Sequence, residues 1–285
     1  MAIYTSKNLE GIKPLKERFN IKVREEFEDG IKTIGILNLM PTKCETETQI
    51  LRLLCETEEN LRVECIKLNT YKPKNISYEY ICENYVSFNE IKEKLDGIII
   101  TGAPLEKLKF EDVDYIDELR EVLDYTKNNI KHSLHICWGA QVALNHFYSI
   151  RKELKEEKIF GLFSNEILER DEILDGIDNG FKAPQSRHTS LNKNDIENCK
   201  ELKLLTVTEE GEQHLLKGSH NDYYILGHIE YDKDTLKKEY LRDLNKGLKI
   251  NLPKGYFKNN NVEEGVNYTW HEDGVKLYKN WVKSL

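Results

Sequence analysis

Short apolar runs that alternate with helical patterns limit the possible folds of this 285-residue chain more than any other sequence feature. Expected strands cover residues 31–39, 61–68 and 97–101 and the run that ends at Ile136, with helical spacing of apolar residues between them. The run over 97–101 is almost wholly apolar, as in strands buried on both faces. This alternation is typical of a mostly parallel sheet covered by helices on both faces, so we predict an α/β fold.

The second half of the chain has a different pattern of short strands, part of which we expect to pair antiparallel. Two helices complete this half, over 234–248 and 266–282. A chain of 285 residues can bury one large hydrophobic core, and one large α/β domain fits this length better than two small domains. We therefore expect a single domain over 1–285. The expected strands of the second half are 160–168, 202–208, 214–217 and 223–230.

The charge balance and the cysteine pattern exclude several classes of protein. The net charge is −8, from 42 basic and 50 acidic residues, and the basic residues are scattered, which argues against a nucleic-acid partner. The N-terminus lacks a secretory pattern, and no apolar run approaches the ~18 residues that cross a membrane. The six cysteines form no CxxC pair. We therefore expect a cytoplasmic protein with free thiols and no metal site.

The segment from Leu134 to Gln141 has the sequence form of a nucleophile elbow. Cys137 stands between an apolar run and a helix start with small residues, where a sharp turn lifts the side chain out of the sheet. The helix N-terminus below it favours a thiolate. Many cysteines are inert core residues, but this position makes Cys137 the candidate nucleophile. His135, two residues earlier, is either a core histidine or a residue that crowds the turn.

A second segment supplies a base and a residue to orient it. On an extended strand, residues two apart share a side, so His228 and Glu230 face the site while Ile229 and Tyr231 face away. An isolated H-x-E spacing is weak evidence, because the histidine can be an ordinary strand-end residue. Together with the cysteine elbow, however, it predicts a Cys137, His228, Glu230 triad.

Four groups of residues in the same order resemble one known family. They are Asn38–Glu47 (NLMPTKCETE), Thr101–Glu106 (TGAPLE), His135–Trp138 (HICW), and Ala183–Arg187 (APQSR) with Gly227–Asp232 (GHIEYD). The chain resembles the homoserine O-acyltransferases of methionine biosynthesis, the homoserine transsuccinylase-type family related to class I glutamine amidotransferases. The resemblance implies a flavodoxin-like, class I glutamine amidotransferase-like three-layer sandwich and a homodimer.

The resemblance also implies an activity, a ping-pong acyl transfer from an acyl-CoA to L-homoserine without a further cofactor. Cys137 would carry the acyl group, and His228 would act as general base with Glu230. Lys43 and the backbone N–H of Trp138 would stabilise the oxyanion. Residues alone would instead make Lys43 a solvated side chain in the first turn of a helix, whose start is marked by a Thr42 and Glu45 capping box.

Three further positions match family residues that contact the amino-acid substrate, namely Lys158, Ser186 and Arg242. A guanidinium can hold an α-carboxylate through two hydrogen bonds. The residue pattern disagrees for Arg242, because it falls opposite the apolar stripe of Leu236, Tyr240 and Leu244 and so is expected to face solvent.

Glu106 bears on which acyl group is used. By resemblance, glutamate at this position goes with acetyl donors and glycine with succinyl donors. Physical reasoning agrees, since a carboxylate would repel the second carboxylate of succinyl-CoA but not an acetyl group. We therefore predict acetyl-CoA as the donor and a homoserine O-acetyltransferase activity.

Other activities stay open at this stage. The alternatives are a homoserine O-succinyltransferase, an L-serine O-acetyltransferase and a glutamine amidotransferase-like hydrolase, because a shorter acceptor costs only ~1–3 kcal/mol in a pocket and fold does not decide function. A catalytically dead module would be expected to lack a triad residue, and all three are present.

Overall fold

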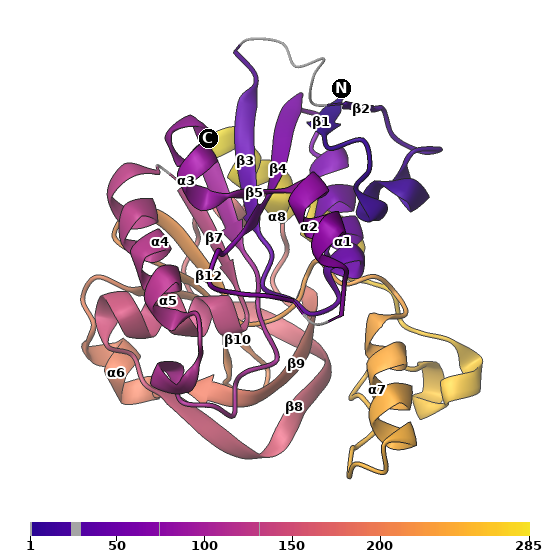
Figure 1. Cartoon of the computed structure of the whole chain (residues 1–285). Helices are drawn as coiled ribbons and strands as arrows, with labels where there is room; N and C mark the ends of the chain where they lie inside the picture. The colour runs from indigo at the N-terminus through magenta and orange to yellow at the C-terminus, as the bar shows by residue number, and fades with distance from the viewer. Residues whose placement is uncertain (1, 24–29, 74, 131) are drawn as a thin grey trace.

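The computed structural model describes residues 2–23, 30–73, 75–130 and 132–285, and these residues form one sheet of twelve strands (Figure 1). The strand order is β2-β1-β4-β3-β6-β7-β12-β11-β10-β8-β9, with β5 beside β4. The parallel part contains β2 (Ile21–Val23), β1 (Ile3–Thr5), β4 (Leu61–Lys67), β5 (Tyr85–Ser87), β3 (Lys32–Leu37), β6 (Gly97–Ile100), β7 (His132–Ile136) and β12 (Asn221–Ile225). The antiparallel part contains β11 (Gln213–Lys217), β10 (Lys203–Thr208), β8 (Lys152–Ile167) and β9 (Lys182–Leu191).

Helices cover both faces of the sheet, and the sheet divides the core into two hydrophobic clusters. On one face, α1 (Lys43–Cys55) and α8 (His271–Ser284) share a cluster with Ile99 of β6. On the other face, α4 (Ile116–Asn129) and α5 (Trp138–Tyr148) share a cluster with Ile98. Successive residues of β6 thus enter opposite clusters, as the alternation of side chains along a strand requires. The predicted three-layer sandwich is confirmed.

Shorter helices complete the described chain, and one of them borders the site. The helix α7 (Thr235–Asn245) lies at the side of the molecule next to the hairpin of β8 and β9, which it contacts through side chains (Figure 1). None of the helices among the described residues is both long and apolar enough to span a bilayer. The other helices are α2 (Tyr78–Asn84), α3 (Phe88–Ile91) and α6 (Lys193–Asn198), with 3-10 turns at Glu10–Leu15, Lys92–Lys94, Phe110–Asp112, Glu172–Leu174, Lys258–Asn260 and Val262–Glu264.

Three strands differ from the sequence prediction. The strand β12 ends at Ile225, before His228 and Glu230. The strand β8 starts at Lys152 rather than at residue 160, because its partner β9 holds the charged first half by backbone pairing that the side-chain pattern does not reveal. No strand was expected over β9.

One local expectation on helices is wrong, and a second holds only in part. The side chain of Thr42 makes no capping hydrogen bond, and Glu45 instead pairs with Lys238 of α7 at 3.0 Å. On α7, Leu236 is buried as expected, but Leu244 is 49% exposed, while Asp243 is buried through its ion pair with Arg242. Tyr240 packs against the core and contacts the ring of Phe257, so the predicted apolar stripe is buried at Leu236, partly buried at Tyr240 and exposed at Leu244.

Candidate active site

Cys137 lies at a strained turn between β7 and α5. Its backbone has φ 52° and ψ −116°, a conformation that residues other than glycine rarely adopt. The backbone N–H of Cys137 donates to the carbonyl of Ile225 at 2.6 Å. The strand–turn–helix arrangement expected of a nucleophile elbow is therefore present.

Two glycines make room for this turn. A Cβ on Gly139 would lie 2.6 Å from the carbonyl oxygen of Thr101, and one on Gly102 would lie 3.1 Å from the Cβ of Cys137. The start of α5 thus packs directly on the end of β6. Trp138 follows Cys137 as the first residue of α5, so its backbone N–H is one of the donors that a helix N-terminus leaves without an intrahelical partner.

His228 and Glu230 are hydrogen-bonded to each other, with 2.7 Å between Nδ1 and Oε1, and both are buried. They lie in a turn rather than on a strand, since the N–H of Tyr231 donates to the carbonyl of His228 at 3.2 Å. Tyr231 was predicted to face away but stacks on the His228 ring, with centroids 4.1 Å apart. The predicted contact exists, but the turn produces it and strand alternation does not.

The electrostatics of His228 are set by its two acidic neighbours. Burial on its own would lower the pKa of His228, but the charges of Cys137 and Glu230 and hydrogen bonds to both raise this pKa well above its ordinary value. His228 thus lies within hydrogen-bonding reach of both Cys137 and Glu230, the arrangement in which a histidine activates a cysteine as a nucleophile.

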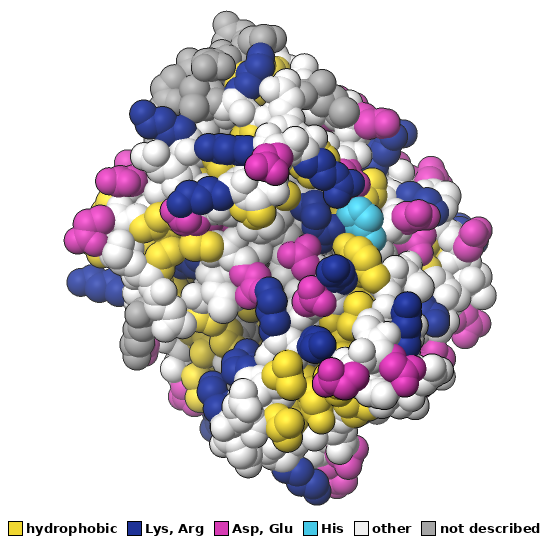
Figure 2. Space-filling view, turned by 90° about the vertical axis from the view of Figure 1, so that its right-hand side faces the viewer, with side chains coloured by type: hydrophobic (Ala, Val, Ile, Leu, Met, Phe, Trp, Pro, Cys, Tyr) yellow, Lys and Arg dark blue, Asp and Glu magenta, His cyan; other side chains and the backbone are white. Residues whose placement is uncertain are grey.

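A cavity of about 700 Å³ joins Cys137 and His228 to residues from α7, β8 and β9. Its walls also contain the loop after β6 and the loop before α1. Figure 2 shows the side of the molecule that carries α7, where hydrophobic, basic and acidic side chains are interspersed. Among the predicted site residues, the cavity is lined by Cys137, His228, Glu106, Lys158, Ser186 and Arg242.

Glu239 of α7 connects the three residues predicted to contact the amino acid. Its carboxylate accepts from Lys158 Nζ at 2.6 Å and from Ser186 Oγ at 2.9 Å, and Arg242 Nη2 lies 3.5 Å away. The sequence analysis missed Glu239. The available signal was its position three residues before Arg242, which places both side chains on one face of a helix.

Arg242 is neither fully solvent-facing nor buried. Its side chain is 53% exposed, lines the cavity, and pairs with Asp243 at 2.7 Å. The residue pattern correctly predicted exposure, and the structure adds that the exposed side borders the cavity.

Glu106 lies in the same cavity as Cys137. Its Oε1 accepts from the backbone N–H of His188 at 3.1 Å, and its own carbonyl accepts from Lys152 Nζ at 2.8 Å. These two contacts fix both the backbone and the carboxylate of Glu106 against β8 and β9.

Lys43 is 4% exposed, so the residue-based expectation of a solvated side chain is wrong. Its Nζ donates to the carbonyl of Asn38 at 2.5 Å and lies 5.5 Å from the ring centres of Tyr71 and Tyr85. Burial lowers the pKa of Lys43 to about 8, an effect that nearby Cys65 and Glu47 oppose. Lys43 is not among the described residues that line the cavity, although its neighbours Pro41 and Thr42 are.

His135 is a core histidine and does not disturb the turn. Its ring is fully buried, stacks on Tyr224 at 4.9 Å, and makes a 2.9 Å hydrogen bond between Nε2 and Ser133 Oγ. Burial lowers the pKa of His135 to about 4, so the ring is neutral at neutral pH.

The sequence model of the homoserine O-succinyltransferase family matches residues 15–285. The chain belongs to this family. A homoserine O-acetyltransferase of Bacillus cereus (strain 03BB102) is 45% identical over 291 residues, which cover 99% of this chain and 96% of the relative. The corresponding protein of Bacillus cytotoxicus has the same identity and coverage. The chain is thus an acyltransferase that acts on homoserine.

Solved structures of low sequence identity share the fold of this family member. A glutamine amidotransferase from Thermotoga maritima matches with a TM-score of 0.61 at 10% identity, covering 90% of this chain and 98% of that one. A glutamine amidotransferase from Methylobacillus flagellatus gives a TM-score of 0.57 at 10% identity, covering 90% and 95%. The class I glutamine amidotransferase-like fold predicted for this homoserine O-acyltransferase is confirmed.

Proposed function

We propose that this enzyme transfers the acetyl group of acetyl-CoA to the γ-hydroxyl of L-homoserine, giving O-acetyl-L-homoserine and CoA for methionine biosynthesis. The single observation that carries the proposal is the cavity in which Cys137, His228 and the Glu106 carboxylate all lie. The relatives named homoserine O-acetyltransferase agree with it.

The first half-reaction acylates the enzyme. The Cys137 thiolate attacks the carbonyl carbon of the thioester, the C–S bond to CoA breaks, and the His228 imidazolium gives its proton to the departing CoA thiolate. The tetrahedral oxyanion would accept from the Trp138 backbone N–H. The family resemblance also implies a role for Lys43, the first residue of α1, whose Nζ donates to the Asn38 carbonyl. A lost oxyanion donor typically costs about 3 kcal/mol.

The second half-reaction uses the same histidine as a base. Acylation removes the thiolate charge that helps to raise the pKa of His228, so this pKa falls and the neutral ring can accept a proton. His228 takes the proton of the homoserine γ-hydroxyl, the oxygen attacks the acyl carbon, and the Cys137 thiolate leaves. Glu230 orients the ring through Nδ1 in both steps.

Homoserine would bind between α7 and the hairpin of β8 and β9. Lys158, Ser186 and Arg242 surround Glu239, and together they offer hydrogen-bond donors for an α-carboxylate and one acceptor for an α-ammonium group. The half-exposed Arg242 guanidinium, which already forms the rim of the cavity, is suited to hold the carboxylate.

Glu106 supports acetyl over succinyl as the donor group. Its carboxylate lies in the cavity and accepts from the His188 N–H, so rotating the carboxylate out of the cavity would break this hydrogen bond. The free carboxylate of a succinyl group would meet this charge in a partly desolvated space, whereas an acetyl group is neutral. The family resemblance further suggests a homodimer, and the sequence patterns described above suggest a cytoplasmic location.

The direct test is thiol release from acetyl-CoA and from succinyl-CoA, each with L-homoserine and with L-serine, and with Cys137→Ala as the control. We expect turnover with acetyl-CoA and homoserine, and none in the Cys137→Ala variant. Full activity in that variant would disprove the acyl-cysteine mechanism.

The other outcomes separate the alternatives. Preference for succinyl-CoA would remove the argument from Glu106 but keep the triad, and preference for serine would change the acceptor. Hydrolysis of glutamine without acyl transfer would assign the protein to the amidotransferase-like hydrolases, whose fold it shares.

A further inference from the structure

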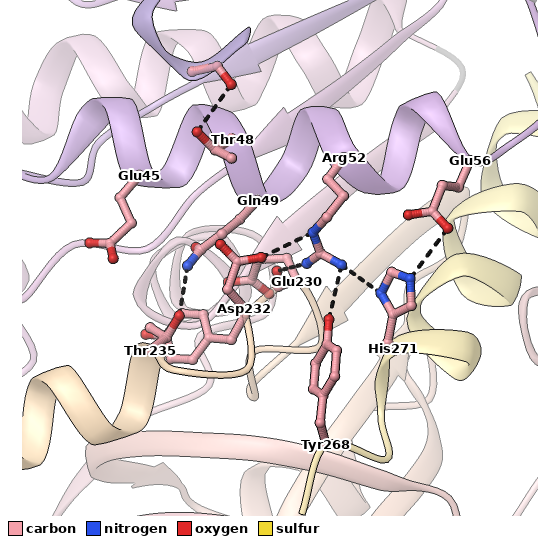
Figure 3. Close-up of polar contacts among 12 residues, drawn as sticks. Glu45, Thr48, Gln49, Arg52, Glu56, Glu230, Asp232, Thr235, Tyr268 and His271 are labelled. Carbon is pink, nitrogen blue, oxygen red and sulfur yellow. Dashed lines mark hydrogen bonds and ion pairs between the residues drawn. The ribbon is translucent and has the colours of Figure 1, made fainter. Parts of the chain in front are cut away.

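A polar stripe on α1 faces the loop that carries His228 and Glu230. Glu45, Gln49, Arg52 and Glu56 are spaced four, three and four residues apart, so they follow one side of the helix and its end. Figure 3 shows Arg52 directed from α1 toward the turn after Glu230, and Glu56 directed toward His271 at the start of α8. Gln49 Nε2 donates to Thr235 Oγ1 at 2.9 Å, which ties the stripe to the start of α7.

Arg52 makes two contacts to the turn itself. Its Nη2 donates to the backbone carbonyl of Glu230 at 3.0 Å, and its Nε lies 3.0 Å from Oδ1 of Asp232 (Figure 3). Trp270 adds a third contact, since its Nε1 donates to the carbonyl of Tyr231 at 2.9 Å. Three successive residues of the turn are therefore held by side chains from α1 and from the N-cap of α8.

The remaining donor of Arg52 connects to the start of α8. Its Nη1 contacts Tyr268 Oη at 3.2 Å and His271 Nδ1 at 2.5 Å, and His271 Nε2 contacts Glu56 at 3.2 Å. Because arginine has no acceptor, Nδ1 of His271 accepts and Nε2 carries the proton donated to Glu56. The Arg52 side chain is only 9% exposed, so these partners define one position for it.

Glu230 depends on this support. Its Oε1 accepts from His228, but its Oε2 is buried without a hydrogen-bond partner among the described residues. The direction of the carboxylate is thus set mainly by the backbone of the turn, which Arg52 holds at the Glu230 carbonyl. A shift of the turn would lengthen the one hydrogen bond that orients His228.

We propose that Arg52 is a positioning residue of the triad, which acts through the turn 230–232 and touches neither substrate nor reacting atoms. The inference rests on the proposed triad chemistry. It predicts that loss of Arg52 changes the ionisation behaviour of the Cys137–His228 pair as well as the rate.

Titratable and charged side chains from several elements surround the Cys137–His228 pair. His228 is flanked by Cys137 of the elbow, by Glu230 and Tyr231 of its own turn, and by His214 of β11. The buried Arg187 of β9 interacts electrostatically with Cys137. Tyr278 of α8 interacts electrostatically with both Glu230 and Arg52. Arg52 contacts Glu230 only through its backbone carbonyl, so an Arg52 substitution leaves the charges of Cys137, Glu230 and Arg187 in place.

The test follows alkylation of Cys137 by iodoacetamide as a function of pH, read for the Cys137 peptide by mass spectrometry. The mid-point of this profile belongs to the coupled Cys137–His228 pair and requires no acyl transfer. In Arg52→Met we expect the mid-point to rise by about one pH unit, as in Glu230→Gln. We expect kcat to fall about 10- to 100-fold, with KM for both substrates nearly unchanged.

Two further variants make the result decisive. Arg52→Lys keeps a positive charge but cannot reach the Glu230 carbonyl and Asp232 together, so we expect an intermediate shift of the mid-point and an intermediate kcat. This variant carries the test if Arg52→Met does not fold. Arg151→Met, which removes an exposed arginine paired with Asp195, is the matched control and should leave both readouts unchanged.

The possible outcomes separate this inference from the proposed function. A lower melting temperature with an unshifted mid-point and normal kcat in the Arg52 variants would overturn the positioning role alone. A wild-type profile identical to that of His228→Asn would show that the coupled pair does not exist, and would overturn the triad together with this inference.

Discussion

At the scale of single residues, the candidate site combines the proposed nucleophile Cys137 with carboxylates that have different partners. In the proposed mechanism, Glu230 orients His228 and Glu239 accepts from the donors of the amino-acid subsite, while Glu106 lines the cavity that contains Cys137. Their proposed roles differ because their partners differ, and each role can be tested by replacing the glutamate with glutamine, which removes the negative charge.

Removing the charge of Glu106 should weaken the discrimination against succinyl-CoA. Two like charges about 4 Å apart repel by about 4 kcal/mol at an effective dielectric constant of about 20. We expect Glu106→Gln to raise the ratio of kcat/KM for succinyl-CoA over acetyl-CoA about tenfold or more, and Glu106→Gly to raise it further by adding space. Steady-state kinetics with both donors measures the ratio. An unchanged ratio in both variants would show that Glu106 does not select the acyl group.

Removing the charge of Glu239 should affect only the second half-reaction. In Glu239→Gln, Lys158 and Arg242 keep Asp243 as an anionic neighbour, so the cavity should persist. We expect KM for homoserine to rise about tenfold or more, since hydrogen bonds to charged groups contribute about 1.5–3 kcal/mol. Formation of the acetyl–enzyme, followed by mass spectrometry without homoserine, should keep its rate. A slower acylation step would contradict the assignment.

At the scale of elements, the site lies where parallel strands end, and the elbow depends on close contact between β6 and α5. A Cβ at position 139 would come within 2.6 Å and 3.0 Å of two backbone oxygens of β6 and the following residue. Backbone atoms cannot move aside as a flexible side chain would.

The contact predicts the effect of a single methyl group. We expect Gly139→Ala to lose about 1–3 kcal/mol of unfolding free energy through overpacking. Activity should fall as well, because the shift displaces the Trp138 N–H and Cys137. Urea unfolding and the acyl-transfer assay measure the two effects. Wild-type stability in this variant would mean that α5 and β6 are less tightly packed than described.

The elements differed in how well the sequence predicts them. The strand β6 was predictable because it is continuously apolar and buried on both faces. The strands β3 and β4 contain polar residues, but they keep apolar residues at alternate positions, Ile34 and Ile36 in β3 and Leu61, Val63 and Cys65 in β4. The first half of β8 is a strand only because β9 pairs with it, and pairing partners are not encoded in local side-chain periodicity.

The site shows the same division. Cys137, His228 and Glu230 lie in recognisable local motifs, so they could be identified from the sequence as candidate site residues. Glu239 and Arg52 are ordinary charged residues on helices, and their importance comes only from what folding places opposite them.

At the scale of the whole molecule, two buried neutral histidines make stability depend on pH. Burial lowers the pKa of His135 to about 4 and that of His214 to about 3. An unfolded histidine has a pKa of about 6.5, so the unfolded state binds more protons below that pH and stability is lost as the pH falls from about 6.5 toward 4. At pH 5 each histidine should cost about 2 kcal/mol.

Replacing one of them should therefore reduce the loss. We expect the fall in unfolding free energy between pH 7.5 and pH 5 to be smaller by about 2 kcal/mol in His135→Phe than in the wild type. His220→Gln, at an exposed position, serves as the control. Urea titrations at the two pH values give the difference, and an equal loss in wild type and His135→Phe would show that His135 is not buried in its neutral form.

The contacts between the triad turn and α8 have a consequence for the order of events during synthesis. Trp270 holds the Tyr231 carbonyl, and Gly274 packs against Ile229, so residues from the end of the described chain fasten a turn that leaves the ribosome well before them. A nascent chain that already contains Cys137, His228 and Glu230 still lacks this fastening. The reactivity of the Cys137 thiol should thus reach its final level only when α8 docks on this turn.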